Sequence, residues 1–543
     1  MLVSSLMTHV QIRAAHNRSV PAPASRASNV AKFGGIMVAS LLLSRILGLV
    51  RDTVMVAQFG IGLDTDAYRI AVQIPDTIFM LIAGGGLSSA FIPVFSGLIH
   101  TDREKEAWDV FSVVATVCAA IAIVLVVLAW IFTPQIVHFF QGKKPDSVLP
   151  PAILMSRIML PAQIAFLVGS IMLATLYARK SFLAPGLAPN VYNVGIILGA
   201  AILPGALGMG IESMAWGALV GALIGNLALP ALAMATEGSR FRPSLAVRHE
   251  GVTRFFKLLL PVILGFSLPS MVNLVTQKFA GIYGADGINT VLSLSNNLMQ
   301  APLGIFGQAL ALAVFPVLSQ FVAEDRMDLY RDQISKTLRT VLYLGAMSGG
   351  LMLALAPQIV TALYGWGKGH SAQELAWTSQ CLRIYSLAIF AWCIQPVLMR
   401  GFFSLHKTLK PVAVGTVMTG LFIVLCAIAT KVSSDFRLLP WATDVAAILL
   451  AISLYFALEG DVGRLDRSGI ATTLWKSLVA AIVASAVAYL GSSLIPTTRP
   501  LTAALSLLFF GLVGFWVFFF VGRALKMPET AYLDRALARL RRK

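Results

Sequence analysis

Fourteen long apolar segments occupy most of this chain and constrain its fold more than any other feature. A helix needs about 20 mostly apolar residues to cross the hydrocarbon core of a bilayer. The segments are residues 30–59, 65–98, 107–133, 150–178, 184–206, 211–236, 255–283, 287–322, 330–355, 374–403, 410–431, 438–458, 471–494 and 500–524. Because backbone groups find no partner in lipid, only helices and closed barrels span it, and uninterrupted runs of this length indicate helices.

The composition excludes the other broad classes. Hydrophobic residues make up 57% of the 543 residues before the 44 glycines are counted, and only 12% are charged. A soluble domain has about 25% charged residues, and disorder requires low hydrophobicity. The four cysteines, Cys118, Cys381, Cys393 and Cys426, all lie in apolar segments, which indicates core residues and not an extracellular disulfide framework. We therefore expect a multi-pass membrane protein.

The distribution of basic residues predicts the orientation. If the N-terminus is cytoplasmic, the inside segments hold 27 Lys and Arg and the outside loops hold six. The positive-inside rule then places both termini in the cytoplasm. This bias also explains the net charge of +17 without a nucleic-acid partner. Residues 1–29 are predicted to be a flexible cytoplasmic extension. Residues 525–543 are predicted to be a basic cytoplasmic tail, in which residues 529–543 form an amphipathic helix on the membrane surface. The alternative for these last residues is a solvated tail.

An internal repeat divides the chain. Residues 84–103 and 307–326 are identical at eight of twenty positions at a constant offset of 223, including Pro93/Pro316 and Arg103/Arg326. We predict an all-α membrane fold of about 14 helices with two six-helix lobes, residues 30–236 and 255–458. Because six is even, the lobes form a parallel repeat, related by an axis along the membrane normal. Helices 13 and 14, residues 471–524, fall outside the repeat.

Charged residues deep in the first segment point to a binding site. A charge at this depth costs about 2.5–3.5 kcal/mol on insertion scales, so it usually faces a hydrated cavity or a partner. Arg45 and Asp52 lie about 20° apart on one helix face, and Arg51 points about 100° away from Asp52. Two arginines and one aspartate favour an anionic substrate, and guanidinium groups match phosphate oxygens. The alternative is a structural ion pair with an acid on another helix.

Polar residues of the second and eighth segments are further candidates. Asp76 follows Pro75, which predicts a kinked helix with a polar lining, and the Gly84–Gly86 run weakens the same segment. Tight helix packing through these small residues is the alternative. Ser88 is a candidate for hydrogen bonds to a sugar or to freed carbonyls. Segment eight carries Asn296, Asn297 and Gln300, whose amides suit sugar hydroxyls or hold helices together.

Motifs for catalysis and for metal binding are missing from the sequence. It contains no phosphate-binding loop, no His-Glu-x-x-His pattern and no Cys-x-x-Cys pattern. No loop between the apolar segments is long enough to form a catalytic domain. The chain is therefore predicted to be a transporter and not an enzyme, without metal or cofactor. It would be driven by a coupling cation, the membrane potential or the gradient of its substrate.

Three motifs in the first two segments resemble a known family. The runs SRILGLVRD (44–52), TDAYRIAVQIPD (65–76) and GGGLSSAFIPVFS (84–96) are similar to the MurJ (MviN) family of lipid II flippases. That family belongs to the superfamily of multidrug, oligosaccharidyl-lipid and polysaccharide exporters. The segments at 184–199 and 296–319 resemble the same family, so the similarity covers most of the chain from about residue 30.

The resemblance implies a function and a site. The family moves undecaprenyl-pyrophosphate-linked peptidoglycan precursor from the inner to the outer leaflet of the bacterial cytoplasmic membrane, for cell wall synthesis and cell shape. It implies fourteen helices, with helices 13 and 14 forming a groove for the lipid tail. Arg45, Arg51 and Asp52 match residues of the family's central cavity, where the arginines would meet the pyrophosphate. Lipid II and membrane lipids are then the expected partners, and the peptidoglycan synthesis machinery is a further candidate.

Several positions depart from the family pattern. Many members have arginine where this chain has Phe79 or Met80, and Glu-Gly where it has Gly84-Gly85. Many also have Asp-Arg at the positions of Asn296-Asn297, Glu at Gln300 and Asn at Asp76. The cavity has thus lost cations, and Arg69 and Lys278 are the candidate compensating charges.

Two other functions remain open from the sequence. One is export of another cargo, either another polyprenyl-linked glycan or an amphiphilic drug that is exchanged for protons or sodium. In an exporter of cationic drugs, the acidic residues Asp52, Asp66 and Asp76 would dominate the cavity. The other is a membrane scaffold for envelope assembly, which would tolerate mutation of every buried charge.

Overall fold

The computed structural model describes residues 23–82, 86–367, 371–495 and 498–531, and in these ranges the chain forms helices without a β-strand. The first half contains α2 (Pro23–Phe59), α3 (Leu63–Ile82), α4 (Gly86–His100), α5 (Glu104–Gln141), the short η1 (Asp146–Val148), α6 (Leu149–Met159), α7 (Ala162–Ala178), α8 (Leu183–Leu207), α9 (Glu212–Ala222), η2 (Leu223–Ala228) and α10 (Leu229–Thr236). The second half contains α11 (Glu250–Tyr283), α12 (Ile288–Pro302), η3 (Leu303–Gln308), α13 (Ala309–Ala323), α14 (Met327–Tyr364), α15 (Ala372–Ser386), α16 (Ile389–Ser404), α17 (Leu409–Val432) and α18 (Leu438–Val462). Helices α19 (Arg467–Ser493) and α20 (Pro500–Ala524) follow.

Each of the fourteen predicted segments coincides with one helix or with consecutive helices. Within the described ranges, ten helical stretches are long and apolar enough to cross a membrane, and α15 with α16 makes an eleventh if this pair, bent by 52°, is one span. The remaining predicted segments correspond to α2, to α3 with α4, and to α11. The all-helical membrane fold is therefore confirmed, whereas the count of fourteen crossings stays a prediction.

Several helix boundaries differ from the prediction. Helix α2 begins at Pro23, so residues 23–29 of the predicted extension are helical. In the second predicted segment, α3 continues past Pro75 to Ile82 and α4 begins at Gly86, and residues 83–85 lie outside the described residues. Segment 150–178 is divided, because α7 starts directly after Pro161, whose ring cannot continue the hydrogen bonding of α6. Residues 1–22, most of the predicted glycine run and residues 532–543 lie outside the described residues.

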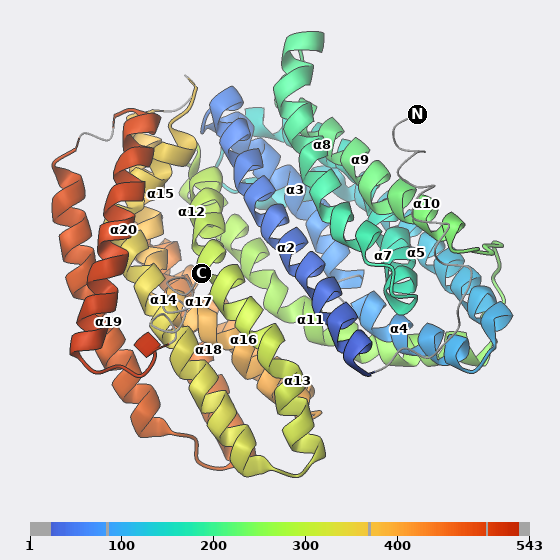
Figure 1. Ribbon diagram of the computed structural model, residues 1–543. Helices are drawn as coiled ribbons and strands as arrows, with labels where there is room; N and C mark the ends of the chain where they lie inside the picture. The colour runs from blue at the N-terminus through green and yellow to red at the C-terminus, as the bar shows by residue number, and fades with distance from the viewer. Residues whose placement is uncertain (1–22, 83–85, 368–370, 496–497, 532–543) are drawn as a thin grey trace.

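The helices pack mainly within the two halves of the chain. In the first half α2 packs on α8, α8 on α9, α3 on α6 and α4 on α7. In the second half α14 packs on α15 and α16, and α18 packs on α16 and α17. Helix α11 contacts α17 and also α3, α4 and α5, while α19 and α20 cover α14. Figure 1 shows the two groups side by side, with α2, α11 and α12 between them.

The two halves share local structure at the repeat. Helices α13 and α14 begin and end 223 residues after α4 and α5, the offset of the sequence repeat. In the turn between each pair, Asp102 and Asp325 both adopt a left-handed conformation, with φ of 57° and 54°. The following amides of Arg103 and Arg326 donate to the carbonyls of Leu98 and Phe321, at 3.0 and 2.8 Å. The repeated sequence therefore encodes the same helix–turn–helix unit twice.

Small residues hold α8 against α9. A Cβ atom built on Gly195 would lie 2.6 Å from Cα of Gly221, and one on Gly199 would lie 2.9 Å from Cα of Gly217. These are two Gly-x-x-x-Gly pairs, the spacing that places small residues on one helix face and lets backbones approach closely in membranes. The four cysteines are buried and unpaired, which confirms their assignment to the core.

Candidate substrate-binding site

Two adjoining polar cavities lie between the halves of the chain. The larger has a volume of about 250 Å³, and the smaller of about 240 Å³; they share Arg51 and Asn297 in their walls. The larger is lined by residues from α2, α3, α8, α11, α12 and α15, and the smaller by residues from α2, α8 and α12. Residues from both halves thus form one connected polar region at the centre of the helix bundle.

Asp52 is the centre of the charge cluster beside these cavities. Its side chain is 1% exposed, and its Oδ1 accepts from Nη2 of Arg51 at 3.1 Å and from Nη2 of Arg69 at 3.2 Å. Its Oδ2 accepts from Nδ2 of Asn297 at 2.7 Å, which links α2 to α12. Arg51 remains 23% exposed and lines both cavities. The carboxylate that pairs with Arg51 is therefore its neighbour on α2 and not an acid on another helix, and the pair leaves Arg51 facing the cavities.

Arg45 has a different environment from Arg51. It is exposed, lines the smaller cavity, and donates from Nη1 to Oε1 of Gln300 at 3.4 Å. Gln300 in turn donates to Oδ1 of Asn296 at 2.7 Å. Among the described residues no carboxylate lies within ion-pair distance of Arg45. Its charge is thus available to a ligand in the cavity.

The cavity walls carry more positive than negative side chains. Three arginines line the cavities: Arg45, Arg51 and Arg69. Only two carboxylates line them, those of Asp52 and Asp76. Asp76 is exposed to the larger cavity and has no ion pair within the described part of the chain. Arg69, predicted as a compensating charge, does lie in this wall, and its buried Nε atom has no protein partner. This excess of guanidinium groups favours an anion over a cation.

Two of the predicted site residues lie elsewhere. Ser88 on α4 donates to the carbonyl of Ser170 on α7 at 3.4 Å, so it joins two packed helices of the first half. Lys278 donates to the carbonyl of Phe139, and its Nζ lies 3.9 Å from the centroid of the Phe139 ring. Neither residue lines either cavity. The prediction that Lys278 replaces a lost cavity cation is therefore not supported, and we leave both residues out of the proposed site.

Asp66, at the start of α3, is sealed in a buried network between the halves. It pairs with Lys144 at 2.5 Å, and both side chains are 0% exposed. The carboxylate also accepts from the backbone amides of Gly287 and Thr290 at 2.8 Å each. Lys144 donates in addition to the carbonyl of Ala285 at 2.9 Å. This network closes the space between α3 and the start of α12 and leaves Asp66 unavailable to a substrate.

Aromatic and amide residues complete the cavity wall and were not predicted from the sequence. Tyr68, Gln73, Tyr192, Gln277 and Tyr385 all line the larger cavity. Tyr192 and its neighbour Asn193, which lines the smaller cavity, belong to the polar stretch of segment 184–206. Polar residues inside apolar segments were the available signal. That signal does not show which helix face turns toward the cavity.

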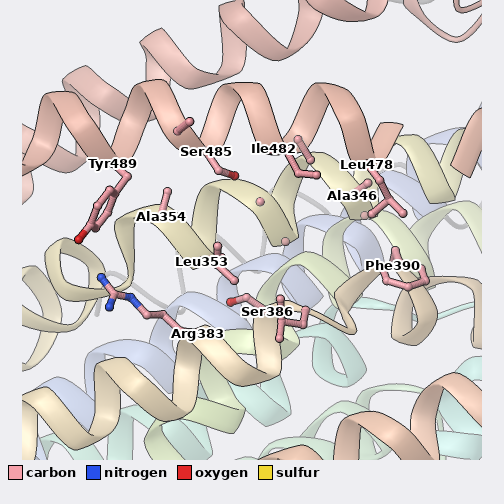
Figure 2. Close-up of a pocket in the computed structure, with 16 residues that line it drawn as sticks. Ala346, Leu353, Ala354, Arg383, Ser386, Phe390, Leu478, Ile482, Ser485 and Tyr489 are labelled. Atoms are coloured by element: carbon pink, nitrogen blue, oxygen red, sulfur yellow. The ribbon is translucent and has the colours of Figure 1, made fainter. Parts of the chain in front are cut away.

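A third, apolar cavity lies between α14, α15, α16 and α19. Its volume is about 550 Å³, and Figure 2 shows Ile482, Leu478 and Phe390 among the side chains that line it. Helix α19 is the thirteenth predicted segment, for which the resemblance implies a lipid-tail groove. Within the described residues, no group of three His, Cys, Asp or Glu side chains could hold a metal ion.

The family follows from comparison with known sequences. The family model of the lipid II flippase MurJ matches residues 55–509. The chain belongs to this family. MurJ of Burkholderia cenocepacia is 26% identical over 69% of this chain and 73% of its own length. Probable MurJ proteins of Vibrio cholerae and Thermotoga maritima are 29% and 25% identical, over 73% and 91% of this chain and 77% and 96% of their own lengths.

Solved structures place the fold among MurJ and multidrug transporters. A lipid II flippase MurJ in an inward closed conformation superposes with a TM-score of 0.73, at 22% identity, covering 89% of this chain and 98% of the other. An inward-facing multidrug resistance MATE family transporter of the MOP superfamily gives a TM-score of 0.66, at 15% identity, covering 79% and 96%. These similarities establish the MurJ fold.

Proposed function

We propose that this protein is a lipid II flippase that moves undecaprenyl-pyrophosphate-linked peptidoglycan precursor across the cytoplasmic membrane. The observation that carries this proposal is the set of three guanidinium groups, Arg45, Arg51 and Arg69, beside two adjoining cavities between the halves of the chain. A diphosphate is the part of the substrate that needs cations in a low-dielectric site. The family to which the chain belongs supports the same function.

The side chains suggest how the headgroup is held. Arg51 keeps its orientation through Asp52, and Asp52 is held by Asn297 and Arg69, so the cluster is preorganised before a ligand enters. Arg45 lies two turns away on α2 and would contact the same diphosphate or the next group of the substrate. The amides of Asn296 and Gln300 and the hydroxyls of the tyrosines would then bind sugar or peptide groups.

Transport requires the cavity to open alternately to each side. We assign residues 30–236 and 255–458 to two lobes that rock against each other, with both termini in the cytoplasm of a bacterium. The contacts of α12 with α2 and α3 and those of α11 with α3, α4 and α5 join the two lobes, so such a movement would change them. We propose a coupling cation or the membrane potential as the energy source, with no catalysis and no cofactor.

Translocation of labelled lipid II tests the function directly. Cells that depend on this protein are depleted of it, and the outer-leaflet appearance of labelled lipid II is measured. We expect this appearance to stop on depletion and to return with the wild-type chain. If it is unchanged while no rival flippase is present, the proposed function is wrong.

A matched pair of variants tests the site. Arg51→Ala removes the guanidinium shared by both cavities and is expected to abolish complementation while the protein still inserts. Lys278→Ala removes a cation that contacts Phe139 and lines neither cavity, and it is expected to retain complementation. Full growth with Arg51→Ala, or equal loss in both variants, would contradict the assignment of the cavity.

A second candidate function is cation-coupled export of a cationic amphiphile. The cavity exposure of Asp76 and the similarity to MATE-family structures favour it. For such an exporter, Asp76→Asn would abolish transport, and loss of Arg45 would have little effect. For a lipid II flippase the order of severity is reversed, because the anionic substrate needs Arg45 more than Asp76. Measuring both variants with labelled lipid II and with a cationic dye separates the two functions.

A further inference from the structure

Asp76 is an unpaired acid in the wall of the larger polar cavity. It lies on α3 and is exposed to that cavity. Among the described residues, no basic side chain lies within ion-pair distance of its carboxylate, and no group donates a hydrogen bond to it. A carboxylate inside a membrane helix is costly unless it faces water or a cation. Its place in a cavity between the two halves therefore points to a positively charged ligand group.

The arginines of the same cavity are committed to another carboxylate. Arg51 donates to Oδ1 of Asp52 at 3.1 Å, and Arg69 donates to the same atom at 3.2 Å. Asp76 therefore keeps its negative charge uncompensated, although both guanidinium groups line the cavity with it. The ion pairs of the wall are complete without Asp76.

The larger cavity has charges of both signs on one helix face. Arg69 and Asp76 both lie on α3 and both line the cavity. Seven residues separate them, so their side chains lie about 20° apart around the helix axis and roughly 10 Å apart along it. A ligand that fills the cavity meets a guanidinium group at one end and a carboxylate at the other.

The surroundings of Asp76 suit an ammonium group. Asn273 on α11 lines the same cavity, and no described residue donates to its amide oxygen. A primary ammonium group has three donors and no acceptor, so carboxylate and amide oxygens complement it. The cavity volume of about 250 Å³ lies below the range of about 300–1,000 Å³ that encloses a complete drug-sized ligand. The cavity therefore fits one part of a larger substrate.

We propose that Asp76 is a specificity-determining residue that binds a primary ammonium group on the peptide part of the headgroup. This inference rests on the proposed function, in which Arg45 and Arg51 bind the diphosphate. The preferred substrate class is then a lipid-linked precursor with charges of both signs, whose peptide carries a free amine on a side chain. A precursor in which this amine is blocked binds more weakly.

Binding of two forms of lipid II to the purified full-length protein tests this proposal. One form has a lysine with a free amine in its peptide, and in the other form the same amine is acetylated. Acetylation removes the positive charge and leaves the diphosphate unchanged. We expect the wild-type protein to bind the free-amine form about tenfold more tightly, because the acetylated form lacks one charge-assisted contact.

Three variants show which residue causes the preference. Asp76→Asn keeps the shape of the side chain and removes its charge, so it is expected to bind both forms with equal affinity. Asp64→Asn is the matched control, because Asp64 is an exposed acid on the same helix that lines neither cavity; it is expected to keep the tenfold preference. Arg51→Ala is expected to weaken the binding of both forms.

Several results would overturn the proposal. If the wild-type protein binds the two forms equally, the proposal is wrong and the proposed function stands. If Asp76→Asn keeps the preference, or if Asp64→Asn loses it as well, Asp76 does not bind the amine. A sodium site at Asp76 would appear as equal binding of both forms, strengthened by sodium in the wild type but not in Asp76→Asn. A wild-type protein that binds neither form contradicts the proposed function and the proposal that rests on it.

Discussion

The buried ion pair of Lys144 and Asp66 gives the most quantitative prediction. The two atoms lie 2.5 Å apart, and both side chains are completely buried between α3, the connection after α5 and the start of α12. Lys144→Met keeps an unbranched side chain of similar length and removes only the charge and the donors. We expect this variant to lose stability because Asp66 then remains as a buried charge without its cation.

The size of the loss follows from the geometry. At an effective dielectric constant of about 20, two unit charges at this distance attract by about 7 kcal/mol. Much of that attraction is offset by desolvation, and removing one partner of a buried pair costs about 3–5 kcal/mol in other proteins. Asp66 would keep its hydrogen bonds from Gly287 and from the amide and hydroxyl of Thr290. We therefore expect a value near the lower end of this range.

Thermal unfolding of the purified protein in detergent measures this loss. Lys144→Met is compared with Lys143→Met, which removes the neighbouring exposed lysine. The double variant Lys144→Met/Asp66→Asn removes both charges, so it should unfold at a higher temperature than Lys144→Met alone. The reasoning is refuted if Lys144→Met and Lys143→Met unfold at the same temperature, or if the double variant is the least stable.

Three further variants test other parts of the structure. Gly217→Ile should destabilise the protein by about 1–3 kcal/mol through overpacking, because a Cβ atom there would lie 3.1 Å from Cα of Gly199; the unfolding temperature measures this. Asp444→Asn should stabilise the protein by about 1–3 kcal/mol and so raise its unfolding temperature, because this carboxylate is 2% exposed and neither oxygen has a partner among the described residues. A lower unfolding temperature in the variant would indicate that the carboxylate has a partner. Arg69→Gln should slow lipid II translocation about tenfold, since it removes a charged contact in the cavity wall, and an unchanged rate would exclude Arg69 from the site.

The sequence predicts the helices well because the bilayer leaves few alternatives. All fourteen apolar segments coincide with helices, and the repeat at an offset of 223 corresponds to α4–α5 and α13–α14, with the same left-handed turn. Residues that interrupt a helix were harder to place. Helix α3 continues past Pro75, so the kink expected there stays a prediction, whereas Pro161 separates α6 from α7. A proline restricts the backbone in both cases, and the neighbouring helices decide the outcome.

The candidate site was predictable only in part. Arg45, Arg51 and Asp52 were singled out because a charge deep in an apolar helix needs a reason to be there, and all three lie beside the polar cavities. Departures from the family pattern suggested Lys278 as a compensating charge, and nothing selected Tyr192, although Tyr192 lines the cavity and Lys278 does not. Helical periodicity gives the angle between residues of one helix. It does not give the rotation of that helix relative to its neighbours.

The sequence by itself determines that this is a helical membrane protein built on a repeat, because the cost of exposing backbone and charge to lipid acts on each segment separately. The tertiary structure decides which charges meet. Asp52 joins Arg51, Arg69 and Asn297 from three helices, Asp66 is closed off by Lys144, and Arg383 is left facing Tyr489 in an apolar groove. These outcomes depend on how distant helices pack, since an ion pair forms only where two side chains come within a few ångströms.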